Sequence, residues 1–430
     1  MSTQKTDKRA YFDWFLLSLF FGYQYLLRSC PSIFTNEIRR TFSINAGQFA
    51  DFGAWCMLVY SCLQIPFGIA LDRIGIRRTV LASFGLCLIG QYGFTHASSY
   101  EGALWGRVLI GIGGAPAYMS ALKLVADTFA EKSCGLFIGI TGMFTVFVVF
   151  CNPLLKKICL EHNDWRIAAN DLNLFGAVVF LLCLLFLFPK KPCGKADEKS
   201  ELPFWSALRR VATDYKVYIY AAFVIGTNIV AMTLADLWGP GFLMTKYHLD
   251  EQQAVSDTQL ITAGMVLGEL LLPILFCSGL KIIRGVQVCC GGLVLIFCLL
   301  IYGAQISPVC LKIVLFAMGL CSAADALAFT LGARLSTPQI SGMLMSWINS
   351  VGMLGEPVLQ KWVGFALDKH WSGTLDAGGL RVYQTTDYES ALMLMLIFTA
   401  VCFATALLMG SLEQSGIKYC TCDNRSFPKE

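Results

Sequence analysis

Charged and polar side chains are rare in the apolar runs of this sequence, so the few that occur there are the first candidates for chemistry. In the run 11–33, Gln24, Tyr25 and Arg28 lie three and four residues apart and therefore share one face of a helix. The planar guanidinium of Arg28 suits recognition of a carboxylate or a phosphate. The alternative is an arginine near the end of its helix that extends to lipid headgroups.

Three acids occupy comparable positions in the second half of the chain, namely Glu269, Asp325 and Glu356. A carboxylate in apolar surroundings can take up and release a proton near neutral pH. We expect Asp325 or Glu269 to couple a proton, with Glu356 and Arg107 as further members of the coupling set. A static ion pair inside the membrane is the competing explanation for each of these residues.

Other polar side chains lie inside two later runs. Asn228 and Asp236 fall near one face of the run 216–244, Trp238 lies just beyond them, and Asn349 falls in the run 339–364. Polar groups in the middle of such runs are expected to face a cavity or a partner. We therefore expect a substrate site made by Gln24, Tyr25, Arg28, Asn228, Trp238 and Asn349.

The composition indicates that these runs lie in a membrane. Hydrophobic residues make up 56% of the 430 residues and charged residues only 14%, against about 25% charged residues in a soluble domain. Runs of about 20 apolar residues can cross a bilayer as helices. The sequence predicts an all-α integral membrane protein with these spans: 11–33, 48–70, 79–97, 102–124, 135–155, 168–188, 216–244, 256–277, 285–305, 310–333, 339–364 and 389–411.

Several other classes of protein do not fit the sequence. Its basic residues are scattered and form no stripe for nucleic acid. Many of its 18 cysteines lie within apolar runs, and Cys420 and Cys422 are too close together and too solitary for a zinc site. It contains no nucleotide-binding G-x-x-x-x-G-K-[ST] motif and no arrangement of residues typical of a nucleophilic enzyme. We expect no metal, no cofactor and no enzymatic activity.

One long polar stretch, which begins at 189, divides the chain into two halves of six spans. The expected organisation is a six-helix bundle over 1–188, a linker over 189–215, a second six-helix bundle over 216–412 and a tail over 413–430. Of the 33 lysines and arginines, 20 lie on the side of the linker and termini and 10 on the other side. The positive-inside rule therefore predicts that both termini and the linker are cytoplasmic.

The segment GIALDRIGIRR between the second and third spans carries the pattern G-x-x-x-D-R-x-G-x-R-R, and the chain thereby resembles the major facilitator superfamily. The matching residues are Gly68, Asp72, Arg73, Gly75, Arg77 and Arg78. The stretch GRVLIGIGGAPA in the fourth span, which begins with Gly106 and Arg107, resembles a second pattern of the family. The resemblance covers about residues 10–412 and implies two pseudo-symmetric six-helix bundles around a central cavity. It also implies that 68–78 acts as a latch between the halves, in which Gly68 permits close helix approach and Gly75 a tight turn.

These features predict a secondary active transporter that takes up a small polar or anionic metabolite, such as an amino acid or a related carboxylate, with protons. The stretches YQYLLRSCPSIF, WGPGFL and NSVGMLGEPVLQ are similar to bacterial uptake permeases that include phagosomal nutrient transporters. Alternatives are export of metabolites or drugs by proton antiport, and import of an organic anion or a siderophore. The antiporter-type Gly-Pro pattern is missing from the fifth span, which disfavours drug export. We expect a monomer in the inner (plasma) membrane, with substrate, protons and lipid as partners.

Overall fold

The fold was analysed in a computed structural model, which describes residues 8–129, 137, 140–187, 212–213, 215–276, 279–303, 306–328, 341–376, 379 and 381–414. Within these ranges the chain is helical, and the only pairing of β type is an isolated bridge between Leu375 and Arg381. The first half contains α1 (Lys8–Ile33), α2 (Thr35–Phe42), α3 (Ala46–Arg73), α4 (Ile76–His96), α5 (Tyr100–Gly114), α6 (Ala117–Thr128), η1 (Phe144–Val146), α8 (Phe147–His162) and α9 (Trp165–Phe186). The second half contains α11 (Tyr215–Val224), η2 (Ile225–Ile229), α12 (Val230–Thr233), η3 (Leu234–Trp238), α13 (Gly239–Tyr247), α14 (Glu251–Leu275), α15 (Gly279–Tyr302), α16 (Pro308–Ser322), α18 (Ser341–Met353), α19 (Gly355–His370) and α20 (Thr385–Gln414).

Nine helical segments of the described chain are long and apolar enough to cross a bilayer. They are Ala46–Leu71, Tyr100–Val125, Ile140–His162, Trp165–Phe186, Val217–Tyr247, Glu251–Leu272, Ile282–Tyr302, Pro308–Ala328 and Thr385–Gly410. The other three expected spans, 11–33, 79–97 and 339–364, are also helical and correspond to α1, α4 and the pair α18–α19. These three spans are not among the nine segments named above. One of them, α1, contains the polar residues Asp13, Gln24 and Arg28.

Local capping fixes several helix starts. The side chain of Asn45 accepts a hydrogen bond from the backbone N–H of Gln48, and the side-chain oxygen of Gln48 accepts one from the backbone N–H of Asn45. The two bonds form a capping box at the start of α3. Asp250 caps α14 in the same sense by accepting from the backbone of Gln253. Because both caps lie at the ends of apolar runs, they set where a span begins.

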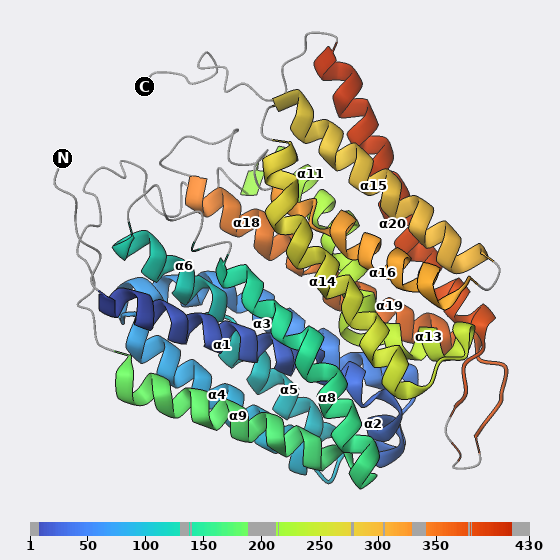
Figure 1. The fold of residues 1–430 in the computed structure, drawn as a ribbon, viewed down its shortest axis with the longest axis horizontal. Coiled ribbons are helices and arrows are strands. Elements are labelled where there is room, and N and C mark those ends of the chain that lie inside the picture. Colours follow the sequence, from blue (N-terminus) through green and yellow to red (C-terminus); the bar gives the residue numbers. More distant parts are fainter. Residues whose placement is uncertain are drawn as a thin grey trace.

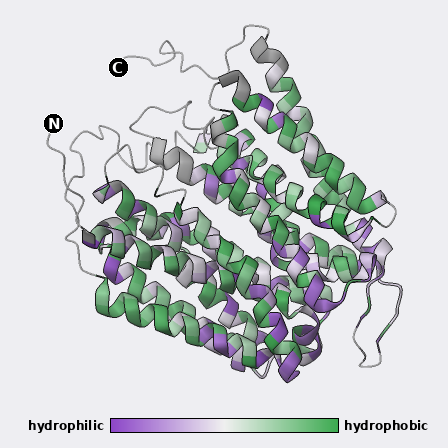
Figure 2. Ribbon diagram, in the orientation of Figure 1, coloured by the Kyte–Doolittle hydropathy of each residue, from purple (hydrophilic) through white to green (hydrophobic). Residues whose placement is uncertain are grey.

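The helices of the first half gather on one side of the molecule and those of the second half on the other (Figure 1). The two sets meet along α1 with η3, α3 with α19, and α8 with α14. Large apolar side chains such as Leu174, Leu185 and Leu295 are exposed on the outside of the helices, and Figure 2 shows the apolar colour spread over these faces. A surface of this kind is suited to contact with lipid.

The span Val217–Tyr247 is interrupted by two π-helical turns, Ile225–Ile229 and Leu234–Trp238. A π turn inserts an extra residue into the helix and rotates the side chains that follow it. Asn228 lies in the first turn and Asp236 in the second. The sequence predicted one continuous helix here, because the two turns are too local to disturb the apolar pattern.

Candidate functional site

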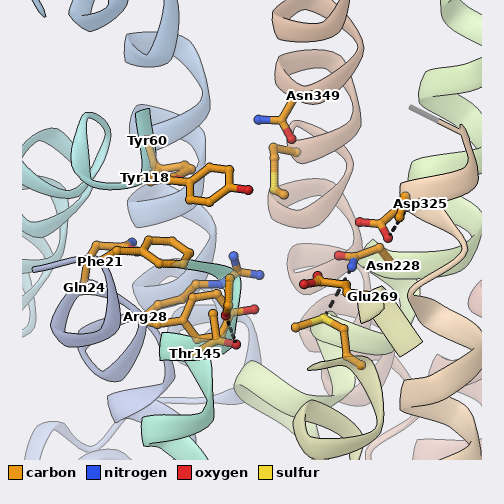
Figure 3. Close-up of a pocket in the computed structure, with 15 residues that line it drawn as sticks. Phe21, Gln24, Arg28, Tyr60, Tyr118, Thr145, Asn228, Glu269, Asp325 and Asn349 are labelled. Atoms are coloured by element: carbon orange, nitrogen blue, oxygen red, sulfur yellow. Dashed lines mark hydrogen bonds between the residues drawn. The ribbon is translucent and has the colours of Figure 1, made fainter. Parts of the chain in front are cut away.

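A cavity of about 270 Å³ lies between residues of the two halves (Figure 3). The residues that line it are Phe21, Gln24, Tyr25, Arg28, Tyr60, Tyr118, Gly142, Thr145, Asn228, Met265, Glu269, Asp325, Ala326, Asn349 and Met353. The volume is close to the lower end of ordinary ligand pockets, so it suits a small solute. Of the expected site residues, the cavity brings together Gln24, Tyr25, Arg28, Asn228, Glu269, Asp325 and Asn349. Trp238, Glu356 and Arg107 are not part of its lining.

Arg28 is engaged by two carboxylates of the other half. Its Nε donates to Oδ2 of Asp236 at 2.5 Å, and its Nη2 donates to Oε2 of Glu356 at 2.7 Å. All three side chains are buried, that of Glu356 completely. Gln360, one turn further along α19, donates from Nε2 to the second oxygen of Glu356 at 2.8 Å. Arg28 therefore does not extend to lipid headgroups, and two of its donors are already occupied.

The charges of this cluster do not balance when all three groups are ionised, since two carboxylates face one guanidinium. Removing charges from water is costly, and the cost is recovered only when the charges are paired and hydrogen-bonded. A single proton on one carboxylate would make the cluster neutral. We call Arg28, Asp236, Glu356 and Gln360 the Arg28 cluster. It can thus bind one proton and become neutral without binding any other ion.

Arg107 lies in another environment. It is fully buried, and it donates to the backbone oxygens of Phe52 at 2.9 Å, Leu27 at 2.7 Å and Arg28 at 3.3 Å. The guanidinium thereby joins α5 to α3 and α1, including the helix that carries Arg28. These contacts hold α5 against α3 and α1, and the expected place of Arg107 among the proton-coupling groups stays a prediction.

The wall of the cavity that belongs to the second half carries Asn228, Glu269 and Asp325 (Figure 3). One oxygen of Asp325 accepts from the backbone of Ala326 at 2.8 Å. Among the described residues, neither Glu269 nor Asp325 has a basic side chain within salt-bridge distance. The two carboxylates that were expected to couple protons thus face the cavity without a cation from the described part of the chain.

The opposite wall is aromatic and comes from the first half. Phe21 and Tyr118 lie with their ring centroids 4.8 Å apart, and the hydroxyl of Tyr118 points across the cavity (Figure 3). Tyr60 lines the same wall, while one face of the Tyr25 ring is covered by the Arg28 guanidinium at 5.1 Å. The predicted site did not include Phe21, Tyr60 or Tyr118, because aromatic residues inside apolar runs give no signal of their own.

The remaining expected substrate residues lie at the contact between the halves. The Trp238 ring packs edge-on against Phe49 with centroids 5.7 Å apart, which places it in the interface rather than in the cavity lining. Asn349 lines the cavity and donates to Gln64 of α3 at 2.9 Å. Gln64 was not predicted, and no feature of its sequence neighbourhood distinguishes it from other polar residues.

A network of polar contacts joins the halves at the end of the molecule opposite the termini (Figure 1). Lys156 of α8 pairs with Glu37 of α2 at 2.6 Å and with Glu251 of α14 at 2.7 Å. The side chain of Asn36 donates to Glu251 at 2.9 Å. Since Glu251 belongs to the second half and the other three residues to the first, these contacts tie the halves together.

A second group of contacts lies nearby, around Asp368 of α19. Its carboxylate accepts from the backbone of Ala46 and Gly47, at the first turn of α3, at 3.3 and 2.7 Å. Tyr383, in the segment between α19 and α20, donates to Asp368 at 2.6 Å. Burial raises the pKa of the Tyr383 phenol, so it remains a neutral donor across the physiological range. We call these two groups of contacts the closing network.

The expected latch occupies the link between α3 and α4. Gly75 is the N-cap residue just before α4 and has a φ of 92°, a conformation that glycine adopts without strain. Arg77 donates to the backbone of Leu184 at 3.0 Å, within the same half. Arg73 and Arg78 are exposed, and the side chain of Asp72 lies outside the described residues. No atom of the described chain lies within 4 Å of a Cβ built on Gly68, so the expected close helix approach at Gly68 is absent here.

The described residues contain no group of three histidines, cysteines, aspartates or glutamates that could hold a metal ion. The arrangement as a whole is that of a binding cavity beside a buried charge cluster.

The chain is similar to known transporters. The family model described as Major Facilitator Superfamily matches residues 10–358. A probable nitrate transporter, NarT, of Staphylococcus epidermidis is 25% identical over 285 residues, which are 66% of this chain and 68% of the relative. An MFS-type efflux pump, elcC, of Phaeosphaeria nodorum is 25% identical over 203 residues, which are 47% of this chain and 34% of the pump.

Two solved structures share the fold. A bacterial homologue of the human lysosomal transporter Spinster, solved in an inward-facing and unoccupied conformation, has a TM-score of 0.75, 16% sequence identity and coverage of 95% of this chain and 98% of its own. The nucleoside transporter NupG, solved as a D323A mutant, has a TM-score of 0.68, 11% identity and coverage of 92% and 99%.

Proposed function

Since the chain belongs to the major facilitator superfamily and is a multi-pass membrane transporter, we propose that it moves a small polar metabolite by proton-coupled alternating access. In this proposal twelve helices form two pseudo-symmetric six-helix bundles, joined by the linker 189–215. The protein acts as a monomer in the inner (plasma) membrane, with both termini in the cytoplasm. Each half rocks against the other around the central cavity.

The observation that carries the proposal is the Arg28 cluster. It is buried beside the cavity, and its ion pairs join Arg28 of the first half to Asp236 and Glu356 of the second half. Any movement that separates the halves at this level must break these pairs. Protonation of Glu356 or Asp236 weakens the attraction to Arg28, because a neutral carboxylic acid has no negative charge to attract the guanidinium. The proton and the movement of the halves are then coupled through the same three side chains.

The conformation of the two halves supports the proposed alternating-access cycle. The closing network joins the halves at the end opposite the termini, and the fold is similar to a transporter solved facing inward. We infer that this is the cytoplasm-facing state. The residues 68–78 would act as a latch in the opposite state, when the cytoplasmic ends of the halves approach each other.

Uptake is the direction we propose. Some relatives are named as transporters of nitrate and one as an efflux pump, and the transport test below distinguishes uptake from export. A purely anionic substrate is less favoured by the geometry, because the one arginine that lines the described cavity is already paired with two acids. An amino acid or another metabolite with more than one polar group fits this environment better.

The test is transport in right-side-out vesicles, with labelled amino acids, nucleosides, amines and carboxylates offered with and without an inward proton gradient. We expect one solute class to accumulate only with the gradient. Glu356→Gln, which keeps the shape of the side chain but fixes it as neutral, should retain exchange of that solute and lose accumulation. The matched control is Glu161→Gln, since Glu161 is exposed and pairs with Lys157 of the same helix at 3.8 Å.

Two outcomes would contradict the proposal. If Glu356→Gln accumulates the solute like the wild type, the Arg28 cluster is not the coupling site. If preloaded solutes leave the vesicles when protons enter, while none accumulates, the protein is an exporter.

A further inference from the structure

The central cavity has a charge pattern that the proposed function uses only in part. Four carboxylates lie in or beside it, namely Asp236, Glu269, Asp325 and Glu356, against the single guanidinium of Arg28. Arg107 adds one more cation behind α1, but it is fully buried and bonded to backbone oxygens. Among the described residues in or beside the cavity, the acids still outnumber the bases. The cavity is therefore electrostatically suited to a cation and unsuited to a free anion.

Two of the four acids are available to a ligand. Asp236 and Glu356 are occupied by Arg28, whereas Glu269 and Asp325 face the cavity without a basic partner in the described chain. One oxygen of Asp325 is held by the backbone of Ala326 at 2.8 Å, which orients the carboxyl group. A ligand cation between these two acids would gain charge-assisted hydrogen bonds.

A second and independent feature is the amide of Gln24. Gln24 is only 3% exposed as a residue and lines the cavity, and its amide has no hydrogen bond to any described residue. Asn228 is similarly buried, and its amide nitrogen contacts only the sulfur of Met265 at 3.5 Å. Buried amides are normally hydrogen-bonded, so an unpaired one that borders a cavity indicates a ligand group as its partner.

The aromatic wall completes the arrangement. Phe21, Tyr60 and Tyr118 face the two free acids across the cavity (Figure 3). A ring face attracts an organic cation and also packs against its apolar body. The site therefore offers acids and amides on one side, and rings with the Gln24 amide on the other.

We propose that the transported solute carries a protonated amine, which binds between Glu269 and Asp325, and a small apolar or aromatic body, which packs against Tyr118 and Phe21. This inference rests on the proposed transport function and names the substrate class of the same cavity. It assigns Glu269 and Asp325 to the substrate and leaves the proton to the Arg28 cluster.

The experiment compares three probes of nearly equal size that differ in charge: phenethylamine, phenethyl alcohol and 3-phenylpropanoate. Binding to the purified full-length protein in detergent is measured by calorimetry, without any gradient. We expect the amine to bind at least about tenfold more tightly than the carboxylate, as one charge-assisted hydrogen bond provides. The double variant Glu269→Gln with Asp325→Asn should lose that preference. Glu161→Gln should behave as the wild type.

A second pair of variants tests the site without touching the acids. Tyr118→Leu should weaken binding of the amine several-fold, while Tyr118→Phe, which keeps the ring, should have a much smaller effect. Equal binding of amine and carboxylate, absence of amine binding, or an amine preference that survives the double variant would each overturn the proposal.

Failure of this inference can be told apart from failure of the proposed function by the vesicle assay. If a carboxylate without an amine accumulates with the proton gradient, the transport function stands and the amine is excluded as the substrate class. If the amine binds through Glu269 and Asp325 but no solute responds to the gradient, the site stands and the proton coupling is wrong.

Discussion

Glu251→Gln should loosen the end of the molecule that the closing network holds shut. In the structure the carboxylate of Glu251 forms an ion pair with Lys156 at 2.7 Å and accepts a hydrogen bond from the amide of Asn36 at 2.9 Å. Both contacts cross between the halves. The substitution preserves shape and removes the charge. Lys156 keeps Glu37 at 2.6 Å, so no buried cation is left without a partner and the fold should survive.

The size of the effect follows from burial. A hydrogen bond between charged groups contributes about 1.5–3 kcal/mol when it is shielded from water, and an exposed ion pair less than about 1 kcal/mol. Lys156 is nearly buried, with 3% of its side chain exposed, and Glu251 has 27% exposed. We therefore expect about 1–2 kcal/mol, which corresponds to a five- to thirty-fold rise in the opening constant.

Hydrogen exchange followed by mass spectrometry measures this constant directly. Amides of α2 and of the first turn of α14 should exchange about five- to thirty-fold faster in Glu251→Gln. When reclosing is faster than the chemical exchange step, the exchange rate is proportional to the population of the open form. Glu161→Gln, a change of the same type in the exposed pair with Lys157, should leave these amides unchanged. If the two variants exchange alike, the closing network does not hold the halves together.

Two further predictions concern stability. Arg107→Met removes the donors of three buried backbone oxygens and should lower the free energy of unfolding by about 3 kcal/mol or more. Arg107→Lys should lower it less, and thermal unfolding in detergent measures both variants. An unchanged melting temperature together with lost proton coupling would instead assign Arg107 to the coupling set. Gly319→Ala would press a Cβ against the backbone oxygen of Ile261 and force α16 away from α14, at about 1–3 kcal/mol. Gly85→Ala in α4 meets open space and should be neutral or slightly stabilising; equal losses at both glycines would show that helix packing is not the cause.

The positions of the spans could be predicted from the sequence because they depend on local properties. The expected spans 168–188 and 389–411 correspond to segments Trp165–Phe186 and Thr385–Gly410 of the structure. Crossing a bilayer requires a continuous apolar length, and that length is written in consecutive residues. The turn at Gly75 was predictable for the same reason, since a positive φ is a local requirement met by glycine.

The candidate site could be predicted only in part. Polar residues inside apolar runs were a sound guide to the cavity, and they selected Gln24, Arg28, Asn228, Glu269 and Asp325. The aromatic wall was missed because Tyr60 and Tyr118 are unremarkable in an apolar run. Gln360 was missed because its role exists only through Glu356, four residues before it on the same helix.

The residue types along the chain determined the membrane location, the helical spans and the short set of polar groups that a cavity could use. The tertiary structure decided which of those groups are free. Arg28 is separated from Asp236 by 208 residues and from Glu356 by 328, and no local pattern encodes those pairings. They arise because buried charges must find partners, and only the packing of α1 against the second half supplies them. That same packing neutralises the arginine expected to bind an anion and leaves Glu269 and Asp325 facing the cavity.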